Sequence, residues 1–214
     1  MARETLSREK VLDAALGFVD THGVSALSMR KLAAELGVEA MSLYNHVKNK
    51  GDLLDGLAAR VFESVPLPDP AQPWETRVRR FAEACHLAFT GHPAVLRTLV
   101  AAEANPRSPG ALRVIDGLLG ALLEAGLDEP ATVRVYRSLM GLIFGAALAE
   151  TIGVTGVPAD RAEHVDDWFR RMTIPAELPH LSRVLPALVQ ADCRHDLETQ
   201  LDLLLTGLRA ELAR

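Results

Sequence analysis

The chain has 214 residues, of which 49% are hydrophobic, 5% are aromatic and 24% are charged. This composition is ordinary for a globular protein, and few aromatic residues beside abundant Ala and Leu favour helices over strands. The formal net charge of −5 excludes a protein that binds polyanions with its whole surface, so any contact with nucleic acid requires a local basic patch.

The two cysteines, Cys85 and Cys193, lie far apart and form no Cys-x-x-Cys pair. Their spacing excludes a disulfide framework and the usual zinc sites, and it predicts a reduced, cytoplasmic protein without metal or cofactor. The polar N-terminus lacks the apolar core of a signal peptide, and the longest apolar run, residues 139–149, is shorter than the roughly 20 residues of a membrane span. We therefore expect no membrane segment.

Four short helices are predicted at the start of the chain. Ser7 is the expected N-cap of the first, and Ser28 is the expected N-cap of the second. Gly23 and Gly37 end these two helices, and Gly37 leaves only a tight turn before the third helix begins near Glu39. The first, second and fourth helices are expected over residues 7–23, 28–36 and 52–64.

Four prolines within eight residues, from Pro66 to Pro73, interrupt this pattern. No helix tolerates that density of proline, so we place a domain boundary here and expect two domains, residues 1–65 and 66–214. The second domain is also predicted to be helical, which makes the fold all-α. Its helices are expected over residues 74–90, 93–104, 109–126, 130–152, 179–189 and 192 to the end, with a long connection after residue 152 that holds at most a short helix near residues 164–172.

The turn at Gly37 joins two short helices in the manner of a helix-turn-helix, in which one helix crosses the DNA backbone and the other enters the major groove. In the second of these helices, Leu43 and Val47 face inward by spacing. That leaves an outward face that can bind phosphates and base edges, made of Met41, Ser42, Tyr44, Asn45 and His46. The alternative is that Tyr44 and His46 pack over the first helix with their polar tips in water.

Basic residues support the first interpretation. Four basic and two acidic residues between positions 26 and 50 give a local charge of about +2, although such a run can also be a solvated face. Lys48 and Lys50 precede the fourth helix, where backbone N–H groups and ammonium groups can converge on one phosphate. Arg30, near the start of the second helix, is placed to contact guanine.

Residues 28–38 (SMRKLAAELGV), residues 42–50 (SLYNHVKNK) and the pair Leu53-Leu54 resemble the tetracycline-repressor (TetR) family, and the resemblance spans residues 7–64. It implies a three-helix DNA-binding head, a larger all-helical domain for ligand binding and dimerisation, and release from operator DNA when a small molecule binds. By position it implies that Arg30 contacts a base, that phosphates are held by Ser28, Ser42, Tyr44 and Lys50, and that the groove is faced by Ala40, Met41, Asn45 and His46. Ala40, Met41 and Asn45 replace larger polar or ring residues, so we expect a different operator sequence.

The resemblance also implies a homodimer through the helices near residues 130–152 and 192–212. Small residues such as Gly141 and Gly145 permit close helix contact, either with a second copy or within one chain. A two-fold dimer sets its recognition helices roughly 34 to 36 Å apart, one DNA turn or a little more, and predicts a pseudo-palindromic operator.

Candidate effector residues lie on the helices expected over residues 74–90 and 130–152. They are Phe81, Cys85, His86, Phe89, Tyr136, Met140 and Phe144, although a packed core produces the same pattern. Tetracycline repressors bind a magnesium chelate through histidines and an asparagine, whereas this chain has apolar Phe81 and Leu99 at two of those positions. We therefore expect an apolar or amphipathic organic effector, wedged between the two helices so that it pushes on the fourth helix.

Two other classes of function remain as alternatives. An all-helical enzyme that processes small molecules is disfavoured because the sequence has no His-Glu-x-x-His, no phosphate-binding glycine loop and no Gly-x-Ser-x-Gly. An activator or partner-binding regulator of the same fold is not separated from a repressor by sequence.

Overall fold

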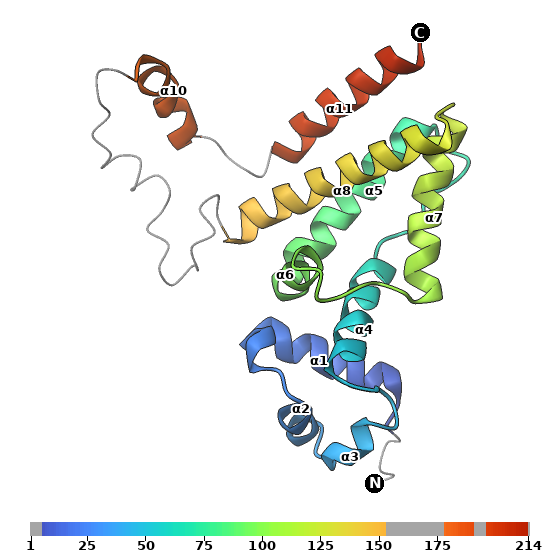
Figure 1. Ribbon diagram of the computed structural model, residues 1–214, viewed down its shortest axis with the longest axis vertical. Helices are drawn as coiled ribbons and strands as arrows, with labels where there is room; N and C mark the ends of the chain where they lie inside the picture. Colours follow the sequence, from blue (N-terminus) through green and yellow to red (C-terminus); the bar gives the residue numbers. More distant parts are fainter. Residues whose placement is uncertain (1–5, 153–177, 191–195, 214) are drawn as a thin grey trace.

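The computed structural model describes residues 6–152, 178–190 and 196–213. Within these ranges the chain forms ten α-helices, one short 3₁₀ helix and no strand, which confirms the all-helical prediction. The helices are α1 (Arg8–His22), η1 (Val24–Ala26), α2 (Met29–Glu35), α3 (Ala40–Leu43), α4 (Lys50–Glu63), α5 (Trp74–Gly91), α6 (Pro93–Val100), α7 (Pro109–Glu124), α8 (Glu129–Ile152), α10 (Pro179–Gln190) and α11 (Asp196–Leu212). Figure 1 shows α1–α3 gathered at one end and the longer helices at the other.

Side-chain caps determine where the first helices begin. The hydroxyl groups of Ser7 and Ser28 each accept a backbone N–H from the first turn of α1 and α2, as predicted. The Asn49 side chain accepts the Asp52 N–H at 2.9 Å, so α4 begins at Lys50, two residues earlier than expected. Lys50 is therefore the first residue of α4 and does not precede it.

Two helices, α3 and α6, end four residues earlier than the sequence indicated. α3 ends at Leu43, and the following residues form a turn before α4. α6 ends at Val100, four residues short of the expected end, and Ala102 then adopts a left-handed φ of 56°. The connection expected after residue 152, its short helix and the predicted start of the last helix at residue 192 lie outside the described residues.

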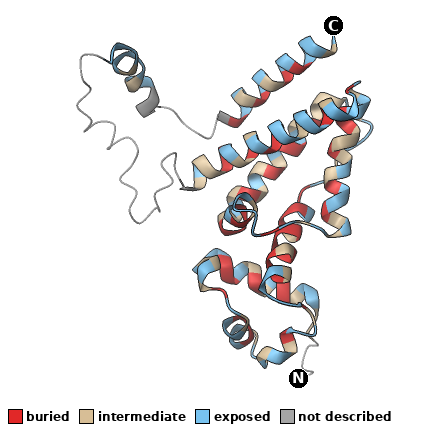
Figure 2. Cartoon of the chain, in the orientation of Figure 1, coloured by how far each residue is buried: buried red, intermediate tan, exposed pale blue. Residues whose placement is uncertain are grey.

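α4 joins the two parts of the molecule because it packs on both. It contacts α1 on one side and α5, α6 and α7 on the other. Gly56 allows the close approach of α1, since a Cβ built there would lie 2.5 Å from Leu12. Leu53, Leu57 and Phe62 bury the length of the helix in one hydrophobic cluster that runs from the head into the body (Figure 2).

The pair α5 and α8 forms the centre of the body, with α7 and α11 packed beside it. Residues 129–151 of α8 are long and apolar enough to cross a membrane, judged by length and composition alone. The apolar run expected from sequence, residues 139–149, is shorter than a membrane span. Core helices of globular proteins satisfy the same test. Arg134 and Arg137 on its exposed side and Leu139 and Ile143 on its buried side give α8 the two-faced pattern of such a helix.

Candidate DNA-binding surface and effector pocket

The head exposes the residues expected to meet DNA. Met41 is 75% exposed and Tyr44 is 46% exposed, whereas Leu43 and Val47 are buried beneath them. Tyr44, Asn45 and His46 lie in the turn that follows α3 and not within a longer helix. Of the ten expected DNA residues, Ser28, Arg30, Met41, Tyr44, Asn45, Lys48 and Lys50 are exposed, and Ala40, Ser42 and His46 are half-buried.

A hydrogen-bonded group ties this turn to α1 and α4. Arg8 donates to the His46 carbonyl at 2.6 Å and to both carboxylate oxygens of Asp52 at 2.8 and 3.1 Å. Asp52 also accepts the Lys48 N–H at 2.8 Å. The hydrogen bonds from Arg8, and that from Lys48, hold the pKa of Asp52 below its usual range. Nothing in the sequence selects Arg8 or Asp52, because the hydrogen bonds that join α1 to this turn and to α4 connect residues about forty positions apart.

The ammonium group of Lys50 lies beside the turn between α1 and α2. Its Nζ donates to the Val24 carbonyl at 3.3 Å, across 26 residues of sequence. The charge therefore sits between the start of α4 and η1, close to where α2 begins. That position is compatible with a phosphate contact shared between these elements.

A pocket of about 810 Å³ opens in the body between α4, α7, α8 and the loop that joins α6 to α7. Three of the expected effector residues, Tyr136, Met140 and Phe144, line it from α8. Its remaining apolar wall comes chiefly from Phe62, Leu99, Leu112 and Ile115, and its polar lining includes Asp55, Asn105, Arg107 and Arg137. Burial raises the pKa of Tyr136, and its hydroxyl, like any phenol near neutral pH, can donate a hydrogen bond.

The expected effector residues on α5 do not line this pocket. Phe89 is buried behind it, with its ring centroid 5.4 Å from Phe62 and 5.2 Å from Phe144. Cys85 is fully buried, and burial raises the pKa of its thiol. His86 lines a separate small pocket, and its Nε2 lies 3.4 Å from a carboxylate oxygen of Glu150. Phe81 lines another cavity, beside the proline-rich linker of residues 66–73 between α4 and α5.

The loop from Ala101 to Ser108, which the sequence did not single out, is bonded to α4, and its residues 102–107 form one wall of the effector pocket. Asp55 accepts the Asn105 N–H at 2.7 Å, and Glu63 accepts the Ser108 hydroxyl at 2.5 Å. The pocket wall is therefore attached to the helix whose first turn carries Lys50. No local sequence pattern could reveal a contact between residues fifty positions apart.

Among the described residues, no group of three His, Cys, Asp or Glu side chains is arranged to hold a metal ion. The polar side chains of the effector pocket carry guanidinium, carboxylate, amide and phenol groups. These can orient an organic molecule by hydrogen bonds while the apolar wall buries its body.

Comparison with known proteins identifies the architecture. Residues 11–57 match the family of bacterial regulatory proteins, tetR family, and residues 67–212 match the tetracyclin repressor-like C-terminal domain. The chain belongs to the TetR family. As a TetR-family member it is a DNA-binding transcription regulator and not an enzyme, as the sequence predicted.

Relatives of this TetR-family chain include known repressors. The HTH-type transcriptional repressor DrrR1 of Streptomyces coeruleorubidus is 31% identical over 153 residues, which are 69% of this chain and 55% of DrrR1. Tetracycline repressor protein class D of Escherichia coli is 44% identical over 85 residues, 38% of either chain. The crystal structure of the Streptomyces coelicolor TetR family protein ActR in complex with actinorhodin superposes with a TM-score of 0.82 at 25% identity, over 98% of this chain and 100% of ActR.

Proposed function

We propose that this TetR-family regulator is an intracellular repressor that binds a pseudo-palindromic operator as a homodimer and leaves it when a small organic effector binds. The observation that carries the proposal is the double role of α4. Its first residue, Lys50, belongs to the exposed basic surface of the head, and Asp55 and Phe62 further along it line the effector pocket. We further propose residues 1–65 and 66–214 as the two functional units, with α4 as the connection between them.

The exposed head residues have distinct roles in this proposal. Arg30 and Asn45 contact base edges, since guanidinium and amide groups are the side chains that discriminate bases in the major groove. Phosphates are bound by Ser28, Ser42, Tyr44, Lys48 and Lys50. Ala40, Met41 and His46 face the groove, where a short apolar side chain can pack against a thymine methyl group.

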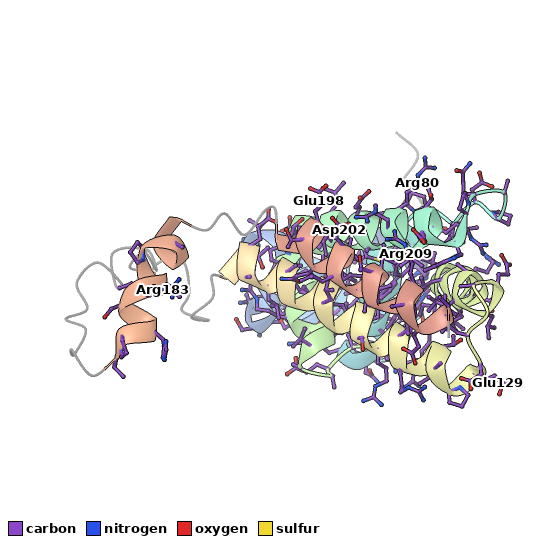
Figure 3. The ribbon with its side chains drawn as sticks, turned by 90° about the horizontal axis from the view of Figure 1, so that it is seen from above. Arg80, Glu129, Arg183, Glu198, Asp202 and Arg209 are labelled. Atoms are coloured by element: carbon purple, nitrogen blue, oxygen red, sulfur yellow. The ribbon has the colours of Figure 1, made fainter. Side chains whose placement is uncertain are left out.

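A homodimer through α8 and α11 is supported by the open face that these helices present. A Cβ built on Gly145 or Gly207 would meet no neighbouring atom of the described residues within 4 Å, so another helix could approach closely there. Leu203 on α11 is 71% exposed. Figure 3 shows α8 and α11 side by side on one face of the body, and ion pairs of Arg79 with Asp202 and of Arg209 with Glu75 fix α11 to α5.

The effector in this proposal is an amphipathic organic molecule with a ring system. A pocket of about 810 Å³ is large enough for a drug-sized ligand, and Phe62, Met140 and Phe144 provide apolar contact area. ActR, which has the same fold, was crystallised in complex with the small molecule actinorhodin. Magnesium tetracycline is disfavoured because Leu99 in the wall offers no metal ligand.

Release follows from the bonded loop. An effector that occupies the pocket contacts the wall formed by residues 102–107, and in this proposal it shifts that wall. Asp55 and Glu63 transmit that movement to α4, because both accept hydrogen bonds from the loop. A coupling free energy of about 1 to 3 kcal/mol weakens operator binding from several-fold to a hundredfold.

The experiment is a two-step selection. The operator is first recovered from random duplex DNA by repeated binding to the full chain, and a two-fold repeat is expected. Compounds that raise the melting temperature of the protein are then tested for release of that operator in a mobility-shift assay. The proposal fails if the selected DNA lacks two half-sites, or if compounds that bind the pocket leave operator affinity unchanged.

A further inference from the structure

A second cavity lies outside the effector pocket, between α5 and the linker that follows α4. Its volume is about 340 Å³. The linker side is formed chiefly by Pro66, Leu67 and Pro68, and the helix side by Arg77, Arg80 and Phe81. It shares no lining residue with the effector pocket. The proposed repressor function therefore leaves this cavity unused.

The linker wall of the cavity is held in place by close packing. A Cβ built on Gly117 of α7 would lie 2.9 Å from Cδ of Pro68, so only glycine lets the proline pack directly on α7. Asp69 then closes a turn, because its carboxylate accepts the Ala71 N–H at 3.0 Å. The cavity therefore has two fixed walls, one formed by the linker and the other by α5.

Arg77 supplies a buried charge with spare donor capacity. It is only 5% exposed, and one of its terminal nitrogens forms an ion pair with Glu124. Its Nε is buried and makes no hydrogen bond within the described part of the chain. Buried donors are normally paired, so Arg77 gains if a small side-chain rotation lets an acceptor atom of a ligand reach this guanidinium.

Arg80 adds a second guanidinium at the outer edge of the cavity. It lies three residues after Arg77, which places both on one side of α5. In Figure 3 the Arg80 side chain extends from the edge of α5, and among the described residues no carboxylate lies within ion-pair distance of it. Asp69 supplies the one carboxylate among the lining residues, and one of its oxygens is occupied by the Ala71 N–H. Because Glu124 already pairs with Arg77, Arg80 is the guanidinium of the lining that can take a new anionic partner.

We propose that this cavity is a binding site for a small organic carboxylate. Its two arginines receive the carboxylate, because guanidinium groups match the planar pair of oxygens. Its proline, leucine and phenylalanine walls contact the apolar body, which favours an organic acid over an inorganic anion. The volume, at the low end for ligand pockets, favours a molecule with a single ring.

Benzoate is a suitable probe, and benzamide is its uncharged match. The full chain is labelled with ¹³C at leucine methyl groups, and the Leu67 signals, assigned with a Leu67→Ile variant, are followed during titration. We expect benzoate to shift these signals in a saturable way and benzamide to bind roughly tenfold more weakly or not at all. Inorganic phosphate is expected to compete poorly, since it cannot use the apolar walls.

The test variant is Arg80→Gln, because Arg80 is exposed and its replacement leaves the fold intact. It is expected to weaken benzoate binding roughly fivefold or more. Arg113→Gln is the matched control, since Arg113 is also exposed but lies outside this cavity, and it should bind as the wild type does. The proposal is overturned if the Leu67 signals do not respond to benzoate at roughly 50 mM. Equal binding of benzamide or phosphate, or unchanged binding in Arg80→Gln, also overturns it.

Discussion

Arg8 at the start of α1 donates two hydrogen bonds to the carboxylate of Asp52, 44 residues later in the first turn of α4, and a third to the carbonyl of His46. These bonds hold the turn after α3 between two helices of the head. The surface proposed to enter the major groove is therefore positioned by an ion pair that need not touch DNA.

Asp52→Asn tests this ion pair. The pKa of Asp52 is lowered in the folded state, chiefly by the hydrogen bonds from Arg8, so its contribution is present above the unfolded value of about 4 and is lost as the pH falls through the lower folded value. We expect Asp52→Asn to reduce the free energy of unfolding by about 1 kcal/mol at neutral pH, and the difference to vanish in acid.

Chemical denaturation of both proteins from pH 7 to about pH 2 measures this effect. Asp116→Asn, an exposed change on α7, serves as the control and should leave the wild-type pH profile unaltered. A constant gap between Asp52→Asn and wild type across the whole range would contradict the prediction.

Lys50→Ala is expected to weaken operator binding and to lower the slope of log affinity against log salt by about one counterion. The reason is the loss of one phosphate contact at the start of α4. Tyr44→Ala should also weaken binding severely. Titrations at several salt concentrations measure both, with Arg113→Ala on the body as the control. If the slope for Lys50→Ala equals that of wild type, Lys50 does not bind a phosphate.

Leu112→Trp is expected to block the effector pocket. Leu112 lies in the pocket wall and is half exposed, so a larger ring at this position projects into the space that the effector needs. Operator binding without effector should change by less than about twofold, while the effector concentration needed for release rises roughly tenfold or more. Leu123→Trp on the same helix is the matched control, because Leu123 is similarly exposed but lies outside the pocket. Equal inhibition by both changes would argue against this pocket.

Asp55→Ala separates effector binding from its transmission. Removing the acceptor for the Asn105 N–H frees the loop from α4 while leaving most of the pocket wall in place. We expect effector affinity, measured by calorimetry, to stay within about threefold and release of operator to require more effector, since the coupling free energy falls. Parallel loss of affinity and release would mean that Asp55 binds the effector and does not transmit its presence.

Leu203→Glu is expected to separate the dimer. A carboxylate on the open face of α11 would be buried without a partner when two copies meet. Sedimentation velocity should show a monomer at micromolar protein concentration, together with weaker operator binding. Leu87→Glu is the matched control, because Leu87 is similarly exposed, at 73%, on α5, a helix that is not part of the proposed interface, and this variant should remain dimeric. A dimeric Leu203→Glu would place the interface elsewhere.

The sequence predicted those features that depend on near neighbours. Ser7 and Ser28 cap helices through residues three positions away, and the glycine turn at Gly37 sets the two short helices in place. Ala102 is different. Its left-handed backbone ends α6 through hydrogen bonds from the Ala102 and Glu103 N–H groups to the Leu99 and Thr98 carbonyls, and this helix end usually has glycine where this chain has alanine, so no glycine signal marked it.

The effector pocket shows the same limit. Helical periodicity marks Phe81, Cys85 and Phe89 as one face of α5, and they are all buried. Periodicity cannot tell a face that packs against other helices from one that borders a cavity, because both are apolar. The three residues found in the pocket, Tyr136, Met140 and Phe144, were separable from the others only after α7 and the loop of residues 101–108 had been placed beside them.

The continuous burial of α4 bears on how new regulators of this kind can be assembled. Gly56 faces Leu12 of α1, while Phe62, about one and two-thirds turns later, faces the body. In a hybrid that joins the head of one regulator to the body of another, the residues on the head-facing and body-facing sides of α4 must therefore be taken from the matching parent. We expect hybrids with a mixed α4, head-facing residues from one parent and body-facing residues from the other, to retain a response to effector that simple fusions at residue 65 lose.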